Sequence, residues 1–151
     1  MTMDIVVIRH PRERISKCSL RFLHDRPGFT FFKATEDFRF DATGHIELAV
    51  DAAPLSPTDA DQPLLILDST WRLLDDLHSH IEGETVRRSI PPGIATAYPR
   101  VSRNYSDPPG GLASIEALYV ALKILGHDDP SILEDYHWKD EFLSNVAAAD
   151  L

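Results

Sequence analysis

Short hydrophobic runs in the first half of the chain predict β-strands. Residues 4–8, 29–33 and 64–67 are almost continuously apolar, which is typical of strands that are buried on both faces of a parallel sheet. Residues 45–50 alternate between polar and apolar side chains and predict a half-buried strand. Residues 52–62 combine two prolines with small side chains and predict a loop.

The second half has a helical pattern. Apolar residues three or four positions apart predict helices over residues 70–80, 113–125 and 130–146. A shorter helix is predicted over residues 16–24 of the first half. Residues 82–111 are rich in Pro, Gly and Arg, and a loop region of this length is usually functional or disordered.

This succession predicts an α/β fold, in which a parallel sheet with flanking helices is followed by a helical C-terminal half. The length of 151 residues fits a single domain. We expect residues 1–80 to form the half that contains the sheet and residues 81–151 to form the helical half, with both in one compact unit.

Composition narrows the class of protein. The hydrophobic fraction of 43% supplies a core, but no apolar run is long enough to span a bilayer. The first residues lack the basic and apolar segments of a secretory signal. The single cysteine, Cys18, excludes an internal disulfide, so we expect a cytoplasmic protein without a membrane partner. The histidines do not combine with cysteines at ligand spacing, and we expect no metal site.

The formal net charge of −9 opposes binding to nucleic acid, but the charges are unevenly distributed. Acidic residues concentrate near the C-terminus, whereas basic residues gather in two segments. One interpretation is a local basic face that contacts RNA, and the other is solvated surface charge without a partner. The residues that would form the basic face are Arg9, Arg12, Arg14, Lys17, Arg87, Arg88, Arg100 and Arg103.

The strand predicted over residues 64–67 is followed directly by Asp68, Ser69, Thr70 and Trp71. In open α/β sheets, ligands bind at the carboxyl ends of the strands. A carboxylate, two hydroxyls and a flat aromatic ring at that edge suit a polar, planar small molecule. The alternative is that Asp68 or Ser69 caps the next helix and Trp71 packs beneath it.

Three further segments carry candidate ligand contacts. The small residues of 91–97 allow a ligand to approach the backbone, or they serve only to pack a crossover segment. Ser114 and Glu116 lie in the first turn of a predicted helix, where they contact a ligand or cap the helix. Ser19 offers a hydroxyl to a ligand, or belongs to an exposed basic helix. Glycine-rich phosphate loops and dinucleotide-binding motifs are absent from the sequence.

Taken in order, these segments resemble the family of ribosomal-RNA aminocarboxypropyltransferases. That family is related to the SPOUT class of RNA-modifying enzymes and, more distantly, to the DTW-domain tRNA modifiers. The resemblance covers most of the chain. It is carried by Lys17-Cys18-Ser19, Leu67-Asp68-Ser69-Thr70-Trp71, Arg88-x-x-Pro91 with Ile94-Ala95-Thr96-Ala97, Asn104-Tyr105, Leu112-x-Ser114-x-Glu116-Ala117 and Trp138-x-x-x-Phe142-Leu143.

The resemblance implies a SPOUT-like fold with a trefoil knot, at which S-adenosylmethionine binds. It implies transfer of the 3-amino-3-carboxypropyl group to N3 of a uridine or pseudouridine in structured RNA, in rRNA rather than tRNA, by a monomer. Asp68 and Trp71 are implied to be catalytic, Asp68 as the base or as support for the sulfonium, with Glu116 as a weaker candidate for the base. The residues implied to bind the cofactor are Ser19, Leu67, Asp68, Ser69, Trp71, Gly93, Ile94, Ala95, Tyr105, Leu112 and Ser114.

Two other functions remain open on the same fold. One is an RNA methyltransferase, which would release S-adenosylhomocysteine instead of methylthioadenosine. The other is a non-catalytic module that binds RNA or a protein partner, and titration with S-adenosylmethionine distinguishes this module from both enzymes.

Overall fold

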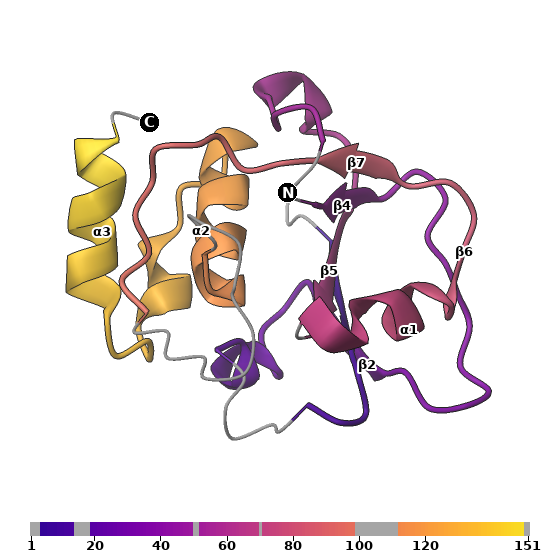
Figure 1. Ribbon diagram of the computed structural model, residues 1–151. Coiled ribbons are helices and arrows are strands. Elements are labelled where there is room, and N and C mark those ends of the chain that lie inside the picture. The colour runs from indigo at the N-terminus through magenta and orange to yellow at the C-terminus, as the bar shows by residue number, and fades with distance from the viewer. Residues whose placement is uncertain (1–3, 14–18, 50–51, 70, 99–111, 150–151) are drawn as a thin grey trace.

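The computed structural model describes residues 4–13, 19–49, 52–69, 71–98 and 112–149, with Trp71 described by its backbone alone. Within these residues, the central element is a five-stranded parallel sheet (Figure 1). In spatial order its strands are β2 (Phe29–Lys33), β1 (Ile5–Arg9), β5 (Leu64–Asp68), β4 (Ile46–Leu48) and β7 (Val86–Arg88). A second, two-stranded sheet pairs β3 (Phe40–Asp41) with β6 (Ile81–Glu82), also in parallel.

The central strands β1 and β5 are apolar on both faces. Val7 of β1 lies opposite Ile66 of β5, and both side chains belong to the larger hydrophobic cluster. Val6 and Leu65, which also lie opposite each other, belong to a second and smaller cluster. Because successive side chains of a strand point to opposite faces, only a nearly continuous apolar sequence can supply both clusters.

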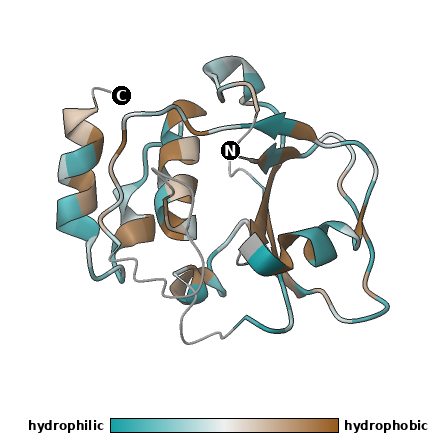
Figure 2. Cartoon of the chain, viewed as in Figure 1, coloured by the Kyte–Doolittle hydropathy of each residue, from teal (hydrophilic) through white to brown (hydrophobic). Residues whose placement is uncertain are grey.

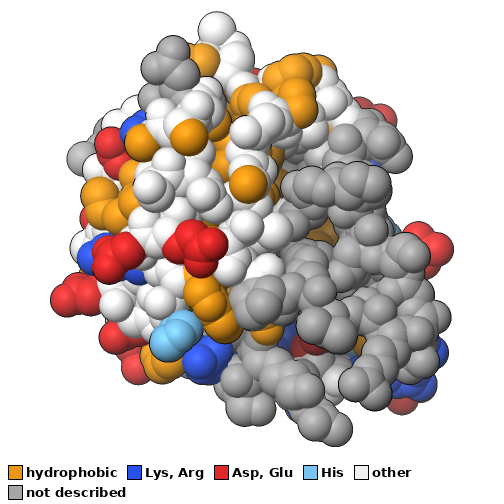
Figure 3. All heavy atoms as spheres, turned by 60° about the vertical axis from the view of Figure 1, so that its left-hand side comes forward, with side chains coloured by type: hydrophobic (Ala, Val, Ile, Leu, Met, Phe, Trp, Pro, Cys, Tyr) orange, Lys and Arg blue, Asp and Glu red, His pale blue; other side chains and the backbone are white. Residues whose placement is uncertain are grey.

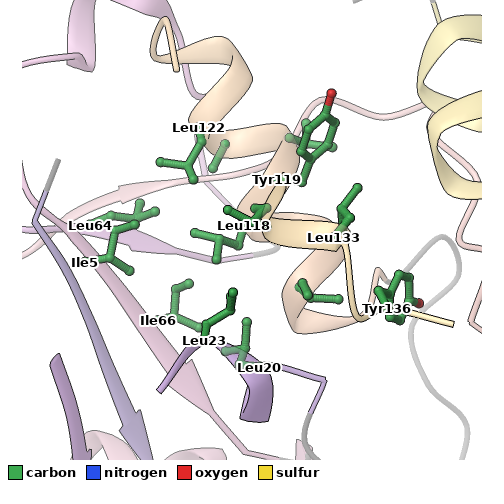
Figure 4. Packing of buried hydrophobic residues seen from close by; sticks show 14 of the residues in the cluster. Ile5, Leu20, Leu23, Leu64, Ile66, Leu118, Tyr119, Leu122, Leu133 and Tyr136 are labelled. Atoms are coloured by element: carbon green, nitrogen blue, oxygen red, sulfur yellow. The ribbon is translucent and has the colours of Figure 1, made fainter. Parts of the chain in front are cut away.

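The larger cluster is covered by α2 (Ser114–Ile124). Figure 4 shows Leu118 and Leu122 of this helix lying over Ile5 and Leu64 of the sheet. Ile115, Leu118 and Leu122 of α2 recur three or four positions apart, and residues 118–122 are all buried, so the helix is covered on most of its sides. Figure 2 shows the same pattern, with hydrophobic colouring on the strands and on the side of α2 that faces them.

The remaining helices are divided between the two faces, as Figure 1 shows. The face covered by α2 also carries residues of three other elements, and the opposite face is packed by α1. The three elements on the first face are the 3₁₀ helices η2 (Arg21–Leu23) and η5 (Pro130–Leu133) and the helix α3 (Lys139–Ala148). On the second face, α1 (Leu74–His78) follows the 3₁₀ helix η4 (Trp71–Leu73). A further 3₁₀ helix, η3 (Pro57–Asp59), precedes β5.

Five predicted elements are confirmed, as is an α/β fold with a parallel sheet. The predicted strands at 4–8, 29–33, 45–50 and 64–67 correspond to β1, β2, β4 and β5, and the periodic segment 113–125 corresponds to α2. In these segments the buried positions follow a regular pattern, and that pattern is visible in the sequence as apolar residues.

Four predictions are wrong in part, and all of them concern short elements. Residues 82–111 were expected to be a loop region, but they contain β7, which pairs with β4 at the edge of the sheet. Its run Val86-Arg87-Arg88 is polar, because an edge strand buries little of its surface. The strand therefore left no apolar pattern in the sequence.

The helix predicted over residues 130–146 is divided into η5 and α3. The 3₁₀ turn buries Ile132 and Leu133 beneath α2, and Tyr136 also joins the core before α3 begins at Lys139. Residues 70–80 likewise form the 3₁₀ helix η4 followed by the single-turn helix α1. Of the helix predicted over residues 16–24, the described part contains only η2.

Candidate functional site

Two charged residues meet where the central strands end. Arg9 is the last residue of β1 and Asp68 is the last residue of β5, and the parallel register places them side by side. The Arg9 Nε donates to Asp68 Oδ2 at 3.1 Å, and the two side chains are only 11% and 12% exposed. This ion pair lies on the face of the sheet that α2 covers, because Arg9 follows Ile5 and Val7 on that face.

The ion pair fixes the position of the Asp68 carboxylate, because the bond from Arg9 occupies Oδ2. A fixed carboxylate at the carboxyl edge of the sheet can stabilise a cationic group nearby. Both roles implied for Asp68, as the base and as support for a cation, stay predictions.

His10 follows Arg9 and is engaged through both of its ring nitrogens. Its Nδ1 accepts from the backbone N–H of Arg12 at 3.1 Å, so the ring proton lies on Nε2, which donates to Asp76 Oδ2 at 2.7 Å. The ring is buried, with 4% of the residue exposed. His10 therefore ties the end of β1 to α1, and Asp76 is a partner that sequence reasoning missed.

A second group of residues surrounds the first turn of α2. Glu116 is fully buried, and its carboxylate accepts three hydrogen bonds. Oε1 accepts from Thr96 Oγ1 at 2.6 Å and from the N–H of Ala113 at 2.8 Å, while Oε2 accepts from the N–H of Ala97 at 2.8 Å. Glu116 caps α2, as one interpretation of the sequence held, and it also holds residues 96–97 against the helix.

Ser19 reaches the same turn from the other side. Its hydroxyl oxygen accepts from the N–H of Ile115 at 3.1 Å, which satisfies one of the free donors at the start of α2. The structure thus places the cofactor candidate Ser19 at the first turn of α2, where the candidate Ser114 also lies. The nearby Leu112 is half-buried and packs against the larger cluster.

Residues 93–97, which include the cofactor candidates Gly93, Ile94 and Ala95, are held from two sides. Ile94 is buried, whereas Gly93 and Ala95 are exposed. The carbonyl oxygen of Ala95 accepts from Asn145 Nδ2 of α3 at 2.9 Å. Gly93 has a φ of +99°, which explains the glycine, since side chains strain this conformation. Asn145 was missed because a polar residue on an amphipathic helix carries no signal of its partner.

The remaining cofactor candidates are placed differently. Leu67 packs in the smaller cluster on the α1 side, so a ligand near Asp68 would meet its backbone rather than its side chain. Ser69 follows Asp68 at the strand end and is half-buried. Trp71 begins η4. Tyr105 lies outside the described residues.

The basic candidates that the structure describes do not form one group. Arg12 is exposed beyond the end of β1. Arg87 and Arg88 lie in β7, with β5 and β4 between them and β1, and they pair with Glu47 at 3.3 Å and Asp59 at 3.2 Å. The candidates Arg14, Lys17, Arg100 and Arg103 lie outside the described residues.

Two further properties of the described residues concern metal ions and membranes. No cluster of three or more His, Cys, Asp or Glu side chains within them is suited to hold a metal ion. Their helices are also too short or too polar to cross a membrane.

Comparison with solved structures gives a match over nearly the whole chain. No protein-family profile matches the chain, and no curated protein matches it by sequence. Among solved structures, it is similar to the SAM-dependent rRNA:acp-transferase Tsr3 from Vulcanisaeta distributa, with a TM-score of 0.74 and 25% sequence identity. The match covers 99% of this chain and 82% of that chain. The protein therefore shares its mixed α/β fold, over nearly its whole length, with an enzyme of the kind that the sequence motifs resemble.

Proposed function

We propose that the protein transfers the 3-amino-3-carboxypropyl group of S-adenosylmethionine to N3 of a uridine or pseudouridine in structured RNA, with rRNA as the substrate. The observation that carries this proposal is the similarity to Tsr3 over 99% of the chain. It is independent of the short motifs, because it rests on the course of the whole backbone.

The described residues fit S-adenosylmethionine in their chemistry. Exposed backbone at Gly93 and Ala95 suits an adenine edge, and the Ser19 hydroxyl at the start of α2 suits a ribose. The Asp68 carboxylate suits a sulfonium cation. Trp71, at the start of η4, would line the methionine arm of the cofactor.

When bound, S-adenosylmethionine supplies a sulfonium leaving group and an electrophilic carbon. N3 of the base would form a bond to that carbon while the carbon–sulfur bond breaks, which yields methylthioadenosine and releases the N3 proton. The protein has to present this carbon rather than the methyl group, and orientation supplies most of that selectivity. Ser19 and residues 93–97 would orient the nucleoside, and Asp68 would stabilise the positive charge before transfer.

Product analysis tests the proposal. The purified protein is incubated with S-adenosylmethionine and rRNA, and both products are identified by mass spectrometry. We expect methylthioadenosine together with an aminocarboxypropylated uridine or pseudouridine. S-adenosylhomocysteine with a methylated nucleoside would establish the methyltransferase instead. No calorimetric binding at millimolar S-adenosylmethionine would support the non-catalytic module and contradict the proposal.

The finer features implied by the resemblance belong to the same proposal. We propose a SPOUT-type trefoil knot and a cytoplasmic monomer that acts on rRNA. Support for the knot comes from the resemblance and from the shared fold. Sedimentation of the purified protein with and without RNA measures its oligomeric state.

A further inference from the structure

The turn after Ser19 presents an aromatic ring to solvent. Phe22 of η2 is 49% exposed. Among the residues that the structure describes, it is the large hydrophobic side chain that faces solvent. Its neighbours Leu20 and Leu23 are buried, and Figure 4 shows both pointing toward Ile66 of the sheet. The core thus anchors η2 on both sides of Phe22, so the ring is displayed by a fixed turn rather than by a loose one.

Phe22 is not an isolated surface residue. The Arg21 guanidinium lies 4.3 Å from the centroid of its ring, which is the geometry of a cation–π contact. Two residues later, His24 stacks on Phe31 of β2 with ring centroids 5.1 Å apart and planes at 28°. The His24 side chain is itself 65% exposed. We call Arg21, Phe22, His24 and Phe31 the stacking surface.

Ring contacts connect the stacking surface to the candidate site. The Arg9 guanidinium lies 5.8 Å from the centroid of Phe31, and Arg9 is the partner of Asp68. On the other side, η2 begins two residues after Ser19, which contacts the first turn of α2. A nucleotide placed at Asp68 would therefore have its chain neighbours within reach of these rings.

Arginines lie beside the rings on this side. Arg21 and exposed Arg12 lie near the ends of η2 and β1, together with two exposed acids, Asp25 next to His24 and Asp76 against His10. More exposed acids lie between η5 and the first turn of α3, and Figure 3 shows acidic side chains on the side of the molecule that carries α3. Those acids are Glu134, Asp135, Asp140 and Glu141.

We infer that the stacking surface binds unpaired bases of the RNA next to the modified nucleotide. Exposed aromatic rings with arginine are the feature by which proteins bind single-stranded nucleic acid, because each base offers a π-face. The inference rests on the proposed RNA substrate. It adds that the substrate is single-stranded where it meets the protein, and that the contact is made by stacking.

The test uses the full chain and a fluorescein-labelled, uridine-rich single-stranded RNA of twelve nucleotides, followed by fluorescence anisotropy. Phe22→Leu keeps the apolar bulk but removes the π-face, and we expect affinity to fall by about 5- to 100-fold. Phe22→Tyr should bind within about 3-fold of the original protein, because it keeps the ring. Arg21→Gln should also weaken binding, whereas Arg39→Gln, the same charge change at an exposed arginine next to β3 of the second sheet, should not.

Three results would overturn the inference: Phe22→Leu binding as tightly as the original protein, Phe22→Tyr binding as weakly as Phe22→Leu, or equal losses for Arg21→Gln and Arg39→Gln. Calorimetry with S-adenosylmethionine separates this from failure of the proposed function. A protein that binds S-adenosylmethionine but not the oligonucleotide contradicts the stacking surface alone. A protein that binds the oligonucleotide through Phe22 but not S-adenosylmethionine contradicts the transferase alone.

Discussion

Glu116 is a charged residue without solvent exposure, and its three hydrogen bonds explain how the core tolerates it. All three partners are donors, so the site requires acceptors on both oxygens. The start of α2 adds a favourable dipole for a negative charge. The sequence suggested either a ligand contact or a cap, and the structure shows that Glu116 joins the cap to the 96–97 segment.

Glu116→Gln tests this network. The amide can accept through only one atom, so at least one N–H is left facing another donor. We expect the free energy of unfolding in urea to fall by about 1–3 kcal/mol, and the affinity for S-adenosylmethionine to fall with it. Glu134→Gln, on an exposed glutamate, is the matched control. Unchanged stability of Glu116→Gln would show that the buried contacts contribute little.

Arg9 and Asp68 raise a different question, because the same pair has a structural and a possible catalytic role. Removing one partner leaves the other charge nearly buried and unpaired, so Asp68→Ala should destabilise the protein by about 3 kcal/mol. The double variant Arg9→Met/Asp68→Leu replaces both charges with apolar groups and should recover most of that stability.

Activity of the double variant then decides the role of Asp68. If Asp68 supports the reacting group, methylthioadenosine production should stay low although folding is restored. Production near that of the original protein would mean that the ion pair only stabilises the fold. Unfolding in urea and product release are measured on the same preparations.

At the scale of elements, residues 93–97 are held between two helices. Glu116 of α2 binds Thr96 and Ala97, and Asn145 of α3 binds the carbonyl of Ala95. In Figure 1 the chain passes from β7 over α2 and descends between α2 and α3. The position of α3 therefore sets the position of the backbone proposed to bind adenine.

Asn145→Ala should show this dependence. Alanine favours the helix, so α3 should remain folded, while one hydrogen bond to the segment is lost. A bond of this kind contributes about 0.5–1.5 kcal/mol, so calorimetry should show affinity for S-adenosylmethionine reduced by about 2- to 10-fold. Ser144→Ala, at an exposed position of the same helix, should leave affinity unchanged. Equal affinities for both variants would contradict a positioning role for Asn145.

Arg26 pairs with Asp129 at 2.7 Å, and this contact joins the turn after η2 to the start of η5. Hydrogen bonds from Ser131, with a smaller contribution from Arg26, hold the pKa of Asp129 below its ordinary value. A lowered pKa in the folded state stabilises the protein above about pH 4, and this contribution is lost as the pH falls through the folded-state pKa.

Asp129→Asn should therefore lower stability at pH 7 but not at pH 2.5, as measured by urea unfolding. The effect should be small, because the Asp129 side chain is 46% exposed and water screens the charge. Asp135→Asn removes the same charge from an exposed neighbour and serves as the control. The same loss at both pH values would show that charge is not the cause.

At the scale of the whole molecule, an acidic protein is proposed to act on a polyanion. The net charge of −9 repels RNA at long range, so binding has to depend on local cations. Arg12 is exposed at the end of β1, close in the chain to the Arg9–Asp68 pair. Arg87 and Arg88 lie at the opposite edge of the sheet and pair with carboxylates, so they are weaker candidates.

Arg12→Glu should weaken binding to rRNA fragments and flatten its dependence on salt. Each lost phosphate contact should reduce the slope of log affinity against log salt by roughly 0.7–0.9. Affinity for S-adenosylmethionine should stay nearly unchanged, which separates electrostatics from misfolding. An unchanged affinity for RNA with an unchanged slope would identify Arg12 as ordinary solvated surface.

The sequence alone determined the elements that are buried on a regular pattern. The strands at 4–8, 29–33 and 64–67 and the helix at 113–125 could be predicted because burial imposes a period on their side chains. It also indicated Asp68 as the end of a central strand and Ser114 as the start of a helix. Short polar elements such as β7 carry no such period and were missed.

Only the tertiary structure decided which polar groups meet. Arg9 and Asp68 are 59 positions apart, and Asn145 and Ala95 are 50 apart. Their pairing depends on strand register and helix position, which no local pattern encodes. A fixed partner then determines what each group can do: Asp68 is held by Arg9, both nitrogens of His10 are occupied, and Phe22 is turned outward because Leu20 and Leu23 are buried.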